Sequence, residues 1–298
     1  MKRLVNYLER NTMLNAGALL VYFLFLIFLH DTFVNLSVTI MNTLSLSIYD
    51  KVVGSITLSF LAFFIFLFIK NLRAERERTD LKITYLLIVT GLVIVHSQMN
   101  FVMNIEIIHT LQFGILAVLI FPLTRSFGAT LYYTVLFGAV DEWYQYQVLY
   151  PQKSDYFDFN DLVLDQLGAG LALVFLYTAG LNNLRNSNKW YQSPVFLSMA
   201  VFAIGAAVLF RFSLITVYYK EGTRALMTLS KANDAEAFWR HLPNCDIVYH
   251  VMSPLEGLLA VTAICGLFFL LDVLAGKERG TTSQTPELNS KPVLQGVN

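Results

Sequence analysis

Residues 141–170 read DEWYQYQVLYPQKSDYFDFNDLVLDQLGAG and place six carboxylates between two strongly apolar segments. A charged side chain at the centre of a bilayer costs about 3 kcal/mol or more unless it is paired or hydrated. Charges inside or beside membrane segments are therefore candidates for a functional site. The stretch predicts a membrane protein whose polar chemistry lies at the junction of two helices.

The composition supports a membrane protein. Apolar residues make up 56% of the 298-residue chain and charged residues 14%, against about 25% charged residues in soluble domains. The net charge is zero, which argues neither for nor against a nucleic-acid partner, and we expect none. The two cysteines, Cys245 and Cys265, give no disulfide framework and do not indicate a redox compartment.

Eight apolar stretches are candidates for membrane-spanning helices, each of which needs about 20 mostly apolar residues. They are residues 14–29, 52–69, 83–95, 107–123, 127–143, 161–181, 195–217 and 254–275. The third is short and is expected to extend into 79–82 or 97–100. We predict an all-α polytopic bundle of about eight spans, with a retained first helix instead of a removed signal peptide.

The distribution of Lys and Arg predicts the orientation, because these residues favour cytoplasmic loops. With the N-terminus inside, 14 of them fall on the inner face and six on the outer face, and both termini are cytoplasmic. All five histidines then lie on or near the outer face. The predicted divisions are two N-terminal helices with a basic loop (1–82), a four-helix core (83–181), two C-terminal helices (182–276) with an outer loop (218–249), and a disordered tail (277–298).

Polar residues in the hairpin recur at helical spacing. Glu142 and Gln145 are three apart and share one helix face. A second stripe follows at spacings of three, four and three: Asp158, Asp161, Asp165 and Gly168. Small residues around Gly168 allow another helix to approach closely. We predict an outward-opening pocket lined by Glu142, Gln145, Asp161 and Asp165.

Over about residues 83–181 the chain resembles the VanZ-like family of bacterial membrane proteins. The resemblance rests on an ordered set of three motifs: Glu106-x-x-His109 before an apolar run, Glu142-x-x-Gln145, and Asp161-x-x-x-Asp165-x-x-Gly168. It implies a multi-pass protein of the bacterial plasma membrane with a role in the cell envelope. Some family members lower susceptibility to the glycopeptide antibiotic teicoplanin.

Two positions depart from the family pattern. Lys153 stands where the family usually has Arg, and Lys does not offer a planar bidentate donor. Asp165 stands at the Asn position and adds a carboxylate. If the family site binds an anion through Arg, these changes indicate loss of that ability and gain of a cation or proton site.

The candidate residues have two interpretations. As a catalytic set, Glu142 or Asp161 is the general base and His109 assists. The substrate-binding candidates are Gln145, Lys153, Asp165 and Arg211.

The structural alternative explains the same residues without catalysis. Asp158 and Asp161 cap a helix, Asp165 or Glu256 pairs with Arg211, and His109 only hydrogen-bonds a neighbour. A metal site could be formed by three histidines with three carboxylates, but no HExxH or comparable spacing supports it: His96, His109 and His250 with Asp141, Glu142 and Glu256. We expect neither a metal nor another cofactor.

Three functions stay open from sequence. The first is recognition of a lipid or lipid-linked envelope component in the outward pocket. The second is an intramembrane hydrolase or transferase acting on a lipid. The third is a non-catalytic subunit of a larger membrane complex. The expected partners are membrane lipids and, for the third function, other membrane subunits.

Overall fold

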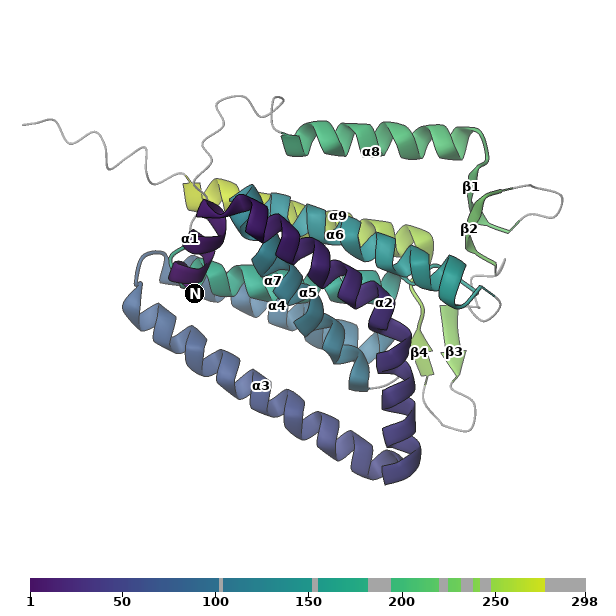
Figure 1. Cartoon of the computed structure of the whole chain (residues 1–298), viewed down its shortest axis with the longest axis horizontal. Coiled ribbons are helices and arrows are strands. Elements are labelled where there is room, and N and C mark those ends of the chain that lie inside the picture. Colours follow the sequence, from purple (N-terminus) through teal and green to yellow (C-terminus); the bar gives the residue numbers. More distant parts are fainter. Residues whose placement is uncertain are drawn as a thin grey trace, which may run out of the picture.

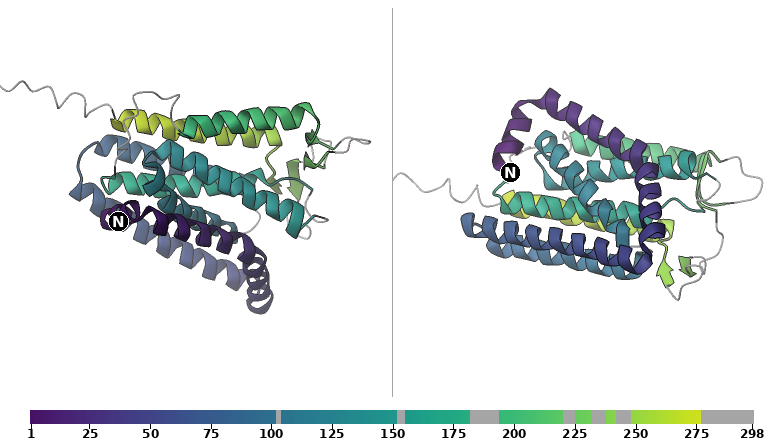
Figure 2. Two further views of the ribbon diagram at one scale, coloured as in Figure 1. Left: turned by 45° about the horizontal axis from the view of Figure 1, so that its top comes forward. Right: turned by 60° about the horizontal axis from the view of Figure 1, so that its bottom comes forward.

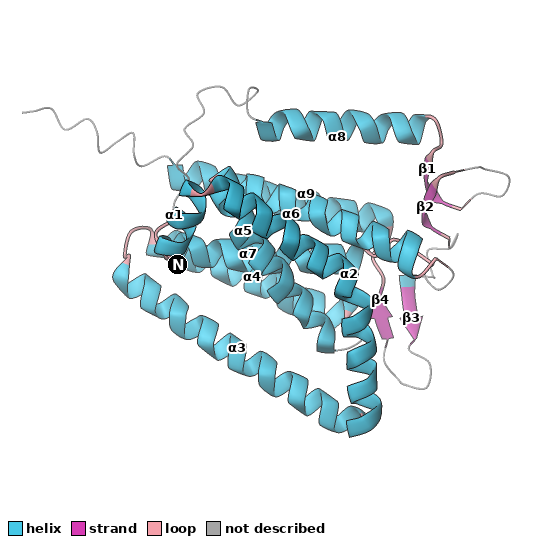
Figure 3. Cartoon of the chain, viewed as in Figure 1, coloured by secondary structure: helices cyan, strands magenta, loops and turns pink. Residues whose placement is uncertain are grey.

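The computed structural model describes residues 1–101, 104–151, 155–181, 194–219, 225–231, 238–241 and 248–276, and within them the chain is mainly helical (Figure 3). The α-helices are α1 (Lys2–Arg10), α2 (Thr12–Leu44), α3 (Leu46–Ala74), α4 (Thr79–Asn100), α5 (Ile108–Thr124), α6 (Phe127–Tyr144), α7 (Phe159–Thr178), α8 (Pro194–Arg211) and α9 (Pro254–Gly276). A 3₁₀ turn, η1 (Asn104–Ile107), precedes α5, and a π-helical turn, η2 (Gln145–Leu149), follows α6.

Each of the eight apolar stretches is helical over most of its length. Six helices are long and apolar enough to cross a membrane: α2, α3, α4, α7, α8 and α9. The weak third stretch extends in both directions, because α4 includes residues 79–82 and 97–100. α5 is apolar but has 17 residues. The described chain therefore has the build of a multi-pass membrane protein.

The all-α prediction needs one correction. The stretch 195–217 is not helical throughout, because α8 ends at Arg211 and Ser213 adopts a left-handed backbone with φ 55°. The β-branched residues that follow then form a strand, as their preference for extended backbone favours. Two small sheets result: β1 (Ile215–Tyr218) pairs with β2 (Met227–Ser230), and β3 (Trp239–His241) pairs with β4 (Val248–His250).

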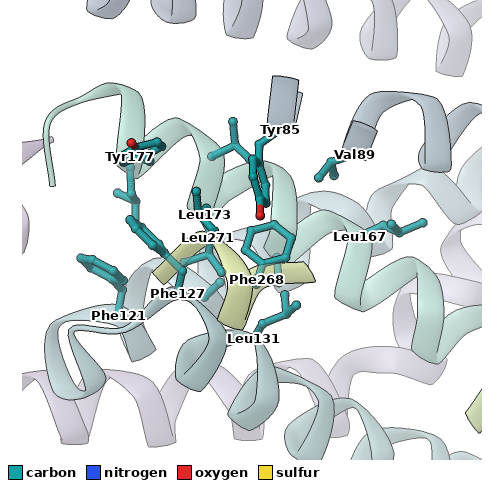
Figure 4. Close-up of a cluster of buried hydrophobic side chains, with 14 of the residues drawn as sticks. Tyr85, Val89, Phe121, Phe127, Leu131, Leu167, Leu173, Tyr177, Phe268 and Leu271 are labelled. Carbon is teal, nitrogen blue, oxygen red and sulfur yellow. The ribbon is translucent and has the colours of Figure 1, made fainter. Parts of the chain in front are cut away.

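The hydrophobic core is built around α7. In its most apolar 18-residue stretch 78% of the residues are buried, against 0% in the corresponding stretch of α8. Side chains from α4, α5, α6, α7 and α9 meet there (Figure 4). Tyr85 of α4 contacts Phe268 of α9 edge to face, and its hydroxyl donates a hydrogen bond to the Leu267 carbonyl at 2.8 Å. The last helix thus belongs to the same core as the central four.

Glycine allows α5 and α7 to pack closely. A Cβ on Gly168 would lie 2.4 Å from the Thr110 backbone, and a Cβ on Gly114 would lie 3.3 Å from the Gly168 carbonyl oxygen. No side chain fits at Gly168 without moving one helix. The predicted close approach of a second helix at this glycine is confirmed. The contact also sets which turns of α5 and α7 lie opposite each other.

The bundle has two distinct ends (Figure 1). α1 lies at one end, and the strands lie at the other, beside the start of α7. α8 runs along one side, and none of its residues is buried (Figure 2). We call the end with α1 the basic end, after Lys2, Lys82 and Arg125, and the end with the strands the acidic end, after Glu142, Asp158, Asp161 and Asp165. The predicted disordered tail, residues 277–298, lies outside the described residues.

Candidate functional site

The site lies at the acidic end, where α5, α6 with η2, and α7 meet. On α6, Glu142 and Asp141 are each 2% exposed, and Gln145 is also buried. The Gln145 amide Nε2 donates at 3.2 Å both to Asp141 Oδ2 and to Glu142 Oε1. Gln145 begins the π-helical turn, in which Tyr150 N donates to the Gln145 carbonyl at 2.8 Å. Such turns are rare and often mark functional sites.

Asp158 and Asp161 occupy the start of α7. The Asp158 carboxylate accepts hydrogen bonds from the backbone N–H groups of Asn160 (2.9 Å) and Asp161 (3.3 Å). Asp158 is therefore an N-cap, and for this residue the structural interpretation is confirmed. Burial, reinforced by the negative charge of Asp161, raises the pKa of the Asp158 carboxyl to about 8.

His109 of α5 links the two remaining aspartates of α7. Its Nδ1 lies 3.0 Å from Asp165 Oδ1, and its Nε2 lies 4.0 Å from Asp161 Oδ2. With Asp165 ionised, Nδ1 carries the proton and donates to it, because an ionised carboxylate only accepts. Asp165 is fully buried, and its Oδ2 rests against α6, where a Cβ on Gly138 would be 3.0 Å away. One carboxylate therefore orients the imidazole ring, and the other faces the opposite nitrogen.

Two carboxylate oxygens in this cluster are unsatisfied. Asp141 Oδ1 and Asp165 Oδ2 are buried and have no hydrogen-bond partner among the described residues. Leaving a buried acceptor unpaired costs about 1–3 kcal/mol, and more when the group is charged. These two unpaired oxygens therefore make the cluster costly for the stability of the fold.

A cavity of about 180 Å³ opens beside this cluster. Its lining is mainly acidic and aromatic: Glu142, Gln145, Tyr146, Tyr150, Asp155, Tyr156, Asp158, Asp161 and Arg240. Strand β2 supports one wall, because Phe157 N donates to the Leu229 carbonyl and Lys231 N donates to the Asp155 carbonyl. Burial, with the neighbouring charge of Asp31, raises the pKa of Tyr150 to about 12, so this phenol stays protonated.

The structure brings most predicted site residues together. Glu142, Gln145 and Asp161 line the cavity. His109 and Asp165 lie directly behind it. Lys153 lies outside the described residues.

Arg211 is not part of the site. It ends α8 and is exposed, whereas Asp165 is fully buried and bonds to His109. The predicted Asp165–Arg211 pair is therefore wrong, since an exposed guanidinium on a peripheral helix cannot reach a carboxylate inside the bundle. Glu256 does not pair with Arg211 either, because its carboxylate lies 3.3 Å from His250 Nε2.

Sequence reasoning missed the roles of Asp155, Arg240 and the three tyrosines. Arg240 Nη1 lies 3.6 Å from Asp155 Oδ2, and its guanidinium lies over the Tyr156 ring, 4.6 Å from the centroid. No spacing in the sequence could have identified these contacts, because they join segments more than 80 residues apart.

The described residues hold no group of three His, Cys, Asp or Glu side chains placed to bind a metal ion. His96 is buried without a hydrogen-bond partner in that part of the chain, and His250 pairs with Glu256. Comparison of the chain with protein families, curated proteins and solved structures finds no match.

Proposed function

We propose that this chain is a multi-pass membrane protein of VanZ-like type that binds the polar head group of a lipid or lipid-linked envelope component at its acidic end. The observation that carries the proposal is the cavity between α6 and α7. All three motifs of the resemblance converge on it, with Glu142 and Asp161 in its wall and His109 behind them. A site at the end of a helical bundle can receive a head group while the acyl chains remain in the bilayer.

The proposed topology has eight spans, with the acidic end on the outer face and both termini in the cytoplasm. Six helices have the required length, and α5 and α6 complete the set. These two helices are short but lie largely inside the bundle, where protein instead of lipid surrounds them. Cysteine labelling, in a chain whose two native cysteines have been replaced, tests this topology. A cysteine at position 51 (Lys51→Cys) should react with a reagent added outside. A cysteine at position 76 (Arg76→Cys) should react only after the membrane is permeabilised. Reaction of both from the same side would contradict the topology.

The binding function is tested by native mass spectrometry of the full-length chain purified in mild detergent. We expect one lipid class to remain bound to the unmodified chain and to be lost from Glu142→Gln. This substitution keeps the size of the side chain and removes its charge. Glu256→Gln is the matched control, because Glu256 lies at the same end but does not line the cavity. Equal lipid retention by all three chains would reject the proposal.

The hydrogen bond between His109 and Asp165 favours a second function, hydrolysis or group transfer on the bound lipid. A carboxylate that orients an imidazole is a common arrangement for general acid–base catalysis. In this mechanism His109 or Glu142 removes a proton from water or a hydroxyl, and Asp161 lies next to the reacting group. Release of head group from lipid extract by the native chain, abolished in both His109→Gln and Glu142→Gln, would support it. Turnover by either variant at the native rate would exclude that residue from catalysis.

A further inference from the structure

The cavity at the acidic end carries an excess of negative charge. Four carboxyl groups line it, and Arg240 is the one basic side chain among the lining residues that the structure describes. Arg240 lies at the rim beside Asp155, whose side chain is 58% exposed. Among the described lining residues, no second basic side chain compensates Glu142 and Asp161 deeper in the cavity. The cavity therefore favours a positively charged occupant.

Glu142 indicates where the charge of that occupant lies. It is 2% exposed, yet it lines the cavity. Its Oε1 accepts from Gln145, while Oε2 receives no hydrogen bond from the described residues. A carboxylate on so little-exposed a side chain is costly unless donors reach it, and the cavity is the route by which a ligand donor could do so. An occupant with N–H donors and a positive charge would satisfy it.

The aromatic lining adds a second, independent preference for a cation. Tyr146 and Tyr156 already have cations over their rings: Lys231 Nζ lies 5.1 Å from the first centroid and Arg240 lies 4.6 Å from the second. The Tyr146 and Tyr150 hydroxyls donate elsewhere, to the Thr228 carbonyl at 2.7 Å and to Asp31 at 3.0 Å. The hydroxyls of Tyr146 and Tyr150 are therefore engaged outside the cavity, and what these lining residues can offer a ligand is ring surface, which attracts ammonium groups.

We propose that the cavity binds the primary ammonium group of a lipid head group, held by Glu142 and Asp161 with the tyrosine rings around it. The volume of about 180 Å³ agrees with this size of ligand. At about 30 Å³ for each water molecule in the liquid, this volume holds about six waters and has room for an aminoalkyl group. The inference rests on the proposed function and specifies the chemistry that its site recognises.

The test uses the full-length chain in phosphatidylglycerol nanodiscs. Three probes are titrated at constant salt: dihexanoyl phosphatidylethanolamine, its N-acetyl derivative, and water-soluble 2-aminoethyl phosphate. The N-acetyl lipid keeps the phosphate and the chains but lacks the positive charge. Binding is followed by tryptophan fluorescence, because Trp143 and Trp239 adjoin Glu142 and Arg240 in the chain.

We expect the amine lipid to bind about tenfold or more tightly than its N-acetyl derivative, as for a charge-assisted hydrogen bond. Glu142→Gln should lower the affinity for the amine lipid by a similar factor, and Glu256→Gln should leave it unchanged. The comparison of the two lipids on the native chain needs no variant and holds even if Glu142→Gln folds poorly.

The remaining outcomes separate this inference from the proposed function. Equal affinity for both lipids, weakened alike by Glu142→Gln, would overturn the ammonium site and leave head-group binding intact. Failure of both lipids to bind would overturn both proposals. Binding of 2-aminoethyl phosphate as tightly as the amine lipid would support the ammonium chemistry and assign it to a soluble amine.

Discussion

At the basic end of the bundle the buried charges are matched, whereas at the acidic end they are crowded and partly unsatisfied. Arg125 forms an ion pair with Glu9, and the buried Lys82 donates to the Glu75 carbonyl at 3.0 Å. At the acidic end, Asp141 and Asp165 each keep one oxygen without a partner among the described residues.

The helix start at the basic end follows the same pattern of full pairing. The Asp272 carboxylate accepts hydrogen bonds from Phe127 N, Gly128 N and the Ser126 hydroxyl, at 2.8, 2.9 and 2.6 Å. It thereby satisfies the first turn of α6 and its dipole.

The difference between the two ends separates structural charge from functional charge. Charges that stabilise a fold are expected to have complete sets of partners, because an unpaired buried charge costs free energy. Charges kept for binding or catalysis are left incomplete until a ligand arrives, at a cost in stability. At the acidic end, two buried carboxylates are incomplete in this way among the described residues. Substitutions at the two ends should therefore have opposite consequences.

The largest effect is expected where the two central helices touch. Gly168→Leu places a side chain against the Thr110 backbone and forces α5 and α7 apart, which also separates His109 from Asp165. We expect a loss of about 3 kcal/mol or more in the free energy of unfolding, or failure to fold. The apparent melting temperature in detergent measures it. Gly91→Leu is the control, because nothing lies within 4 Å of a Cβ there; equal melting of the two variants would contradict the packing argument.

Removing a charge at the basic end should be destabilising. Glu9→Gln leaves the buried Arg125 without its carboxylate. We expect a loss of about 1–2 kcal/mol, less than for a fully buried pair because Glu9 is 39% exposed. Asp80→Asn, at an 81% exposed carboxylate of the same end, should change the melting temperature little. An unchanged melting temperature of Glu9→Gln would show that the Arg125–Glu9 ion pair does not stabilise the fold.

Removing a charge at the acidic end should change the free energy of unfolding in the opposite direction. Asp141→Asn eliminates a buried charge whose Oδ1 has no partner in the described chain, and retains an oxygen that can accept from Gln145. We expect no loss of stability, or a gain of up to about 1 kcal/mol. Melting temperatures of the variant and the native chain, measured side by side, decide this. Destabilisation as large as that of Glu9→Gln would remove the contrast between the ends.

The smallest effect concerns pH. The pKa of Asp158 is raised in the folded chain to about 8, so folding favours its protonated form. Its contribution to stability is fully present below the unfolded pKa, near 4, and is lost as pH rises through about 8. The melting temperature should fall over that range. Asp158→Asn keeps an N-capping side chain that does not titrate, and it should reduce the slope; an unchanged slope would assign the pH dependence to other groups.

Much of this architecture could be predicted from sequence. Long apolar runs without charge form helices because a helix satisfies its own backbone hydrogen bonds, and this placed most of the helices within a few residues. The exception is α2, which continues to Leu44, well beyond the predicted end at residue 29. Helical spacing also placed Glu142 beside Gln145 and put Asp161 and Asp165 on one face, since both relations lie within a single helix. The end of α8 was not predicted, because Ile215–Tyr218 is as apolar as the helix before it and differs only in backbone preference.

Relations between helices could not be predicted in the same way. Arg211 was paired with Asp165 because both were charges at similar predicted depth, but α8 lies at the periphery of the bundle. The partner that Asp165 has, His109, is 56 residues away, and the Gly168–Thr110 contact sets their distance. Arg240 and Tyr156 meet only because β2 and the strands after it fold over the start of α7.

The sequence alone thus determined the apolar helices and the stripe of carboxylates on α7. It also determined that the loops at one predicted face carry most of the Lys and Arg residues. These follow from local backbone hydrogen bonding and from the cost of placing charge in hydrocarbon, which depend on composition and spacing. The tertiary structure decided which charges find partners, which oxygens stay unpaired, and where a cavity remains. Those outcomes depend on how closely particular helices approach, which is set by shape at a few contacts such as Gly168.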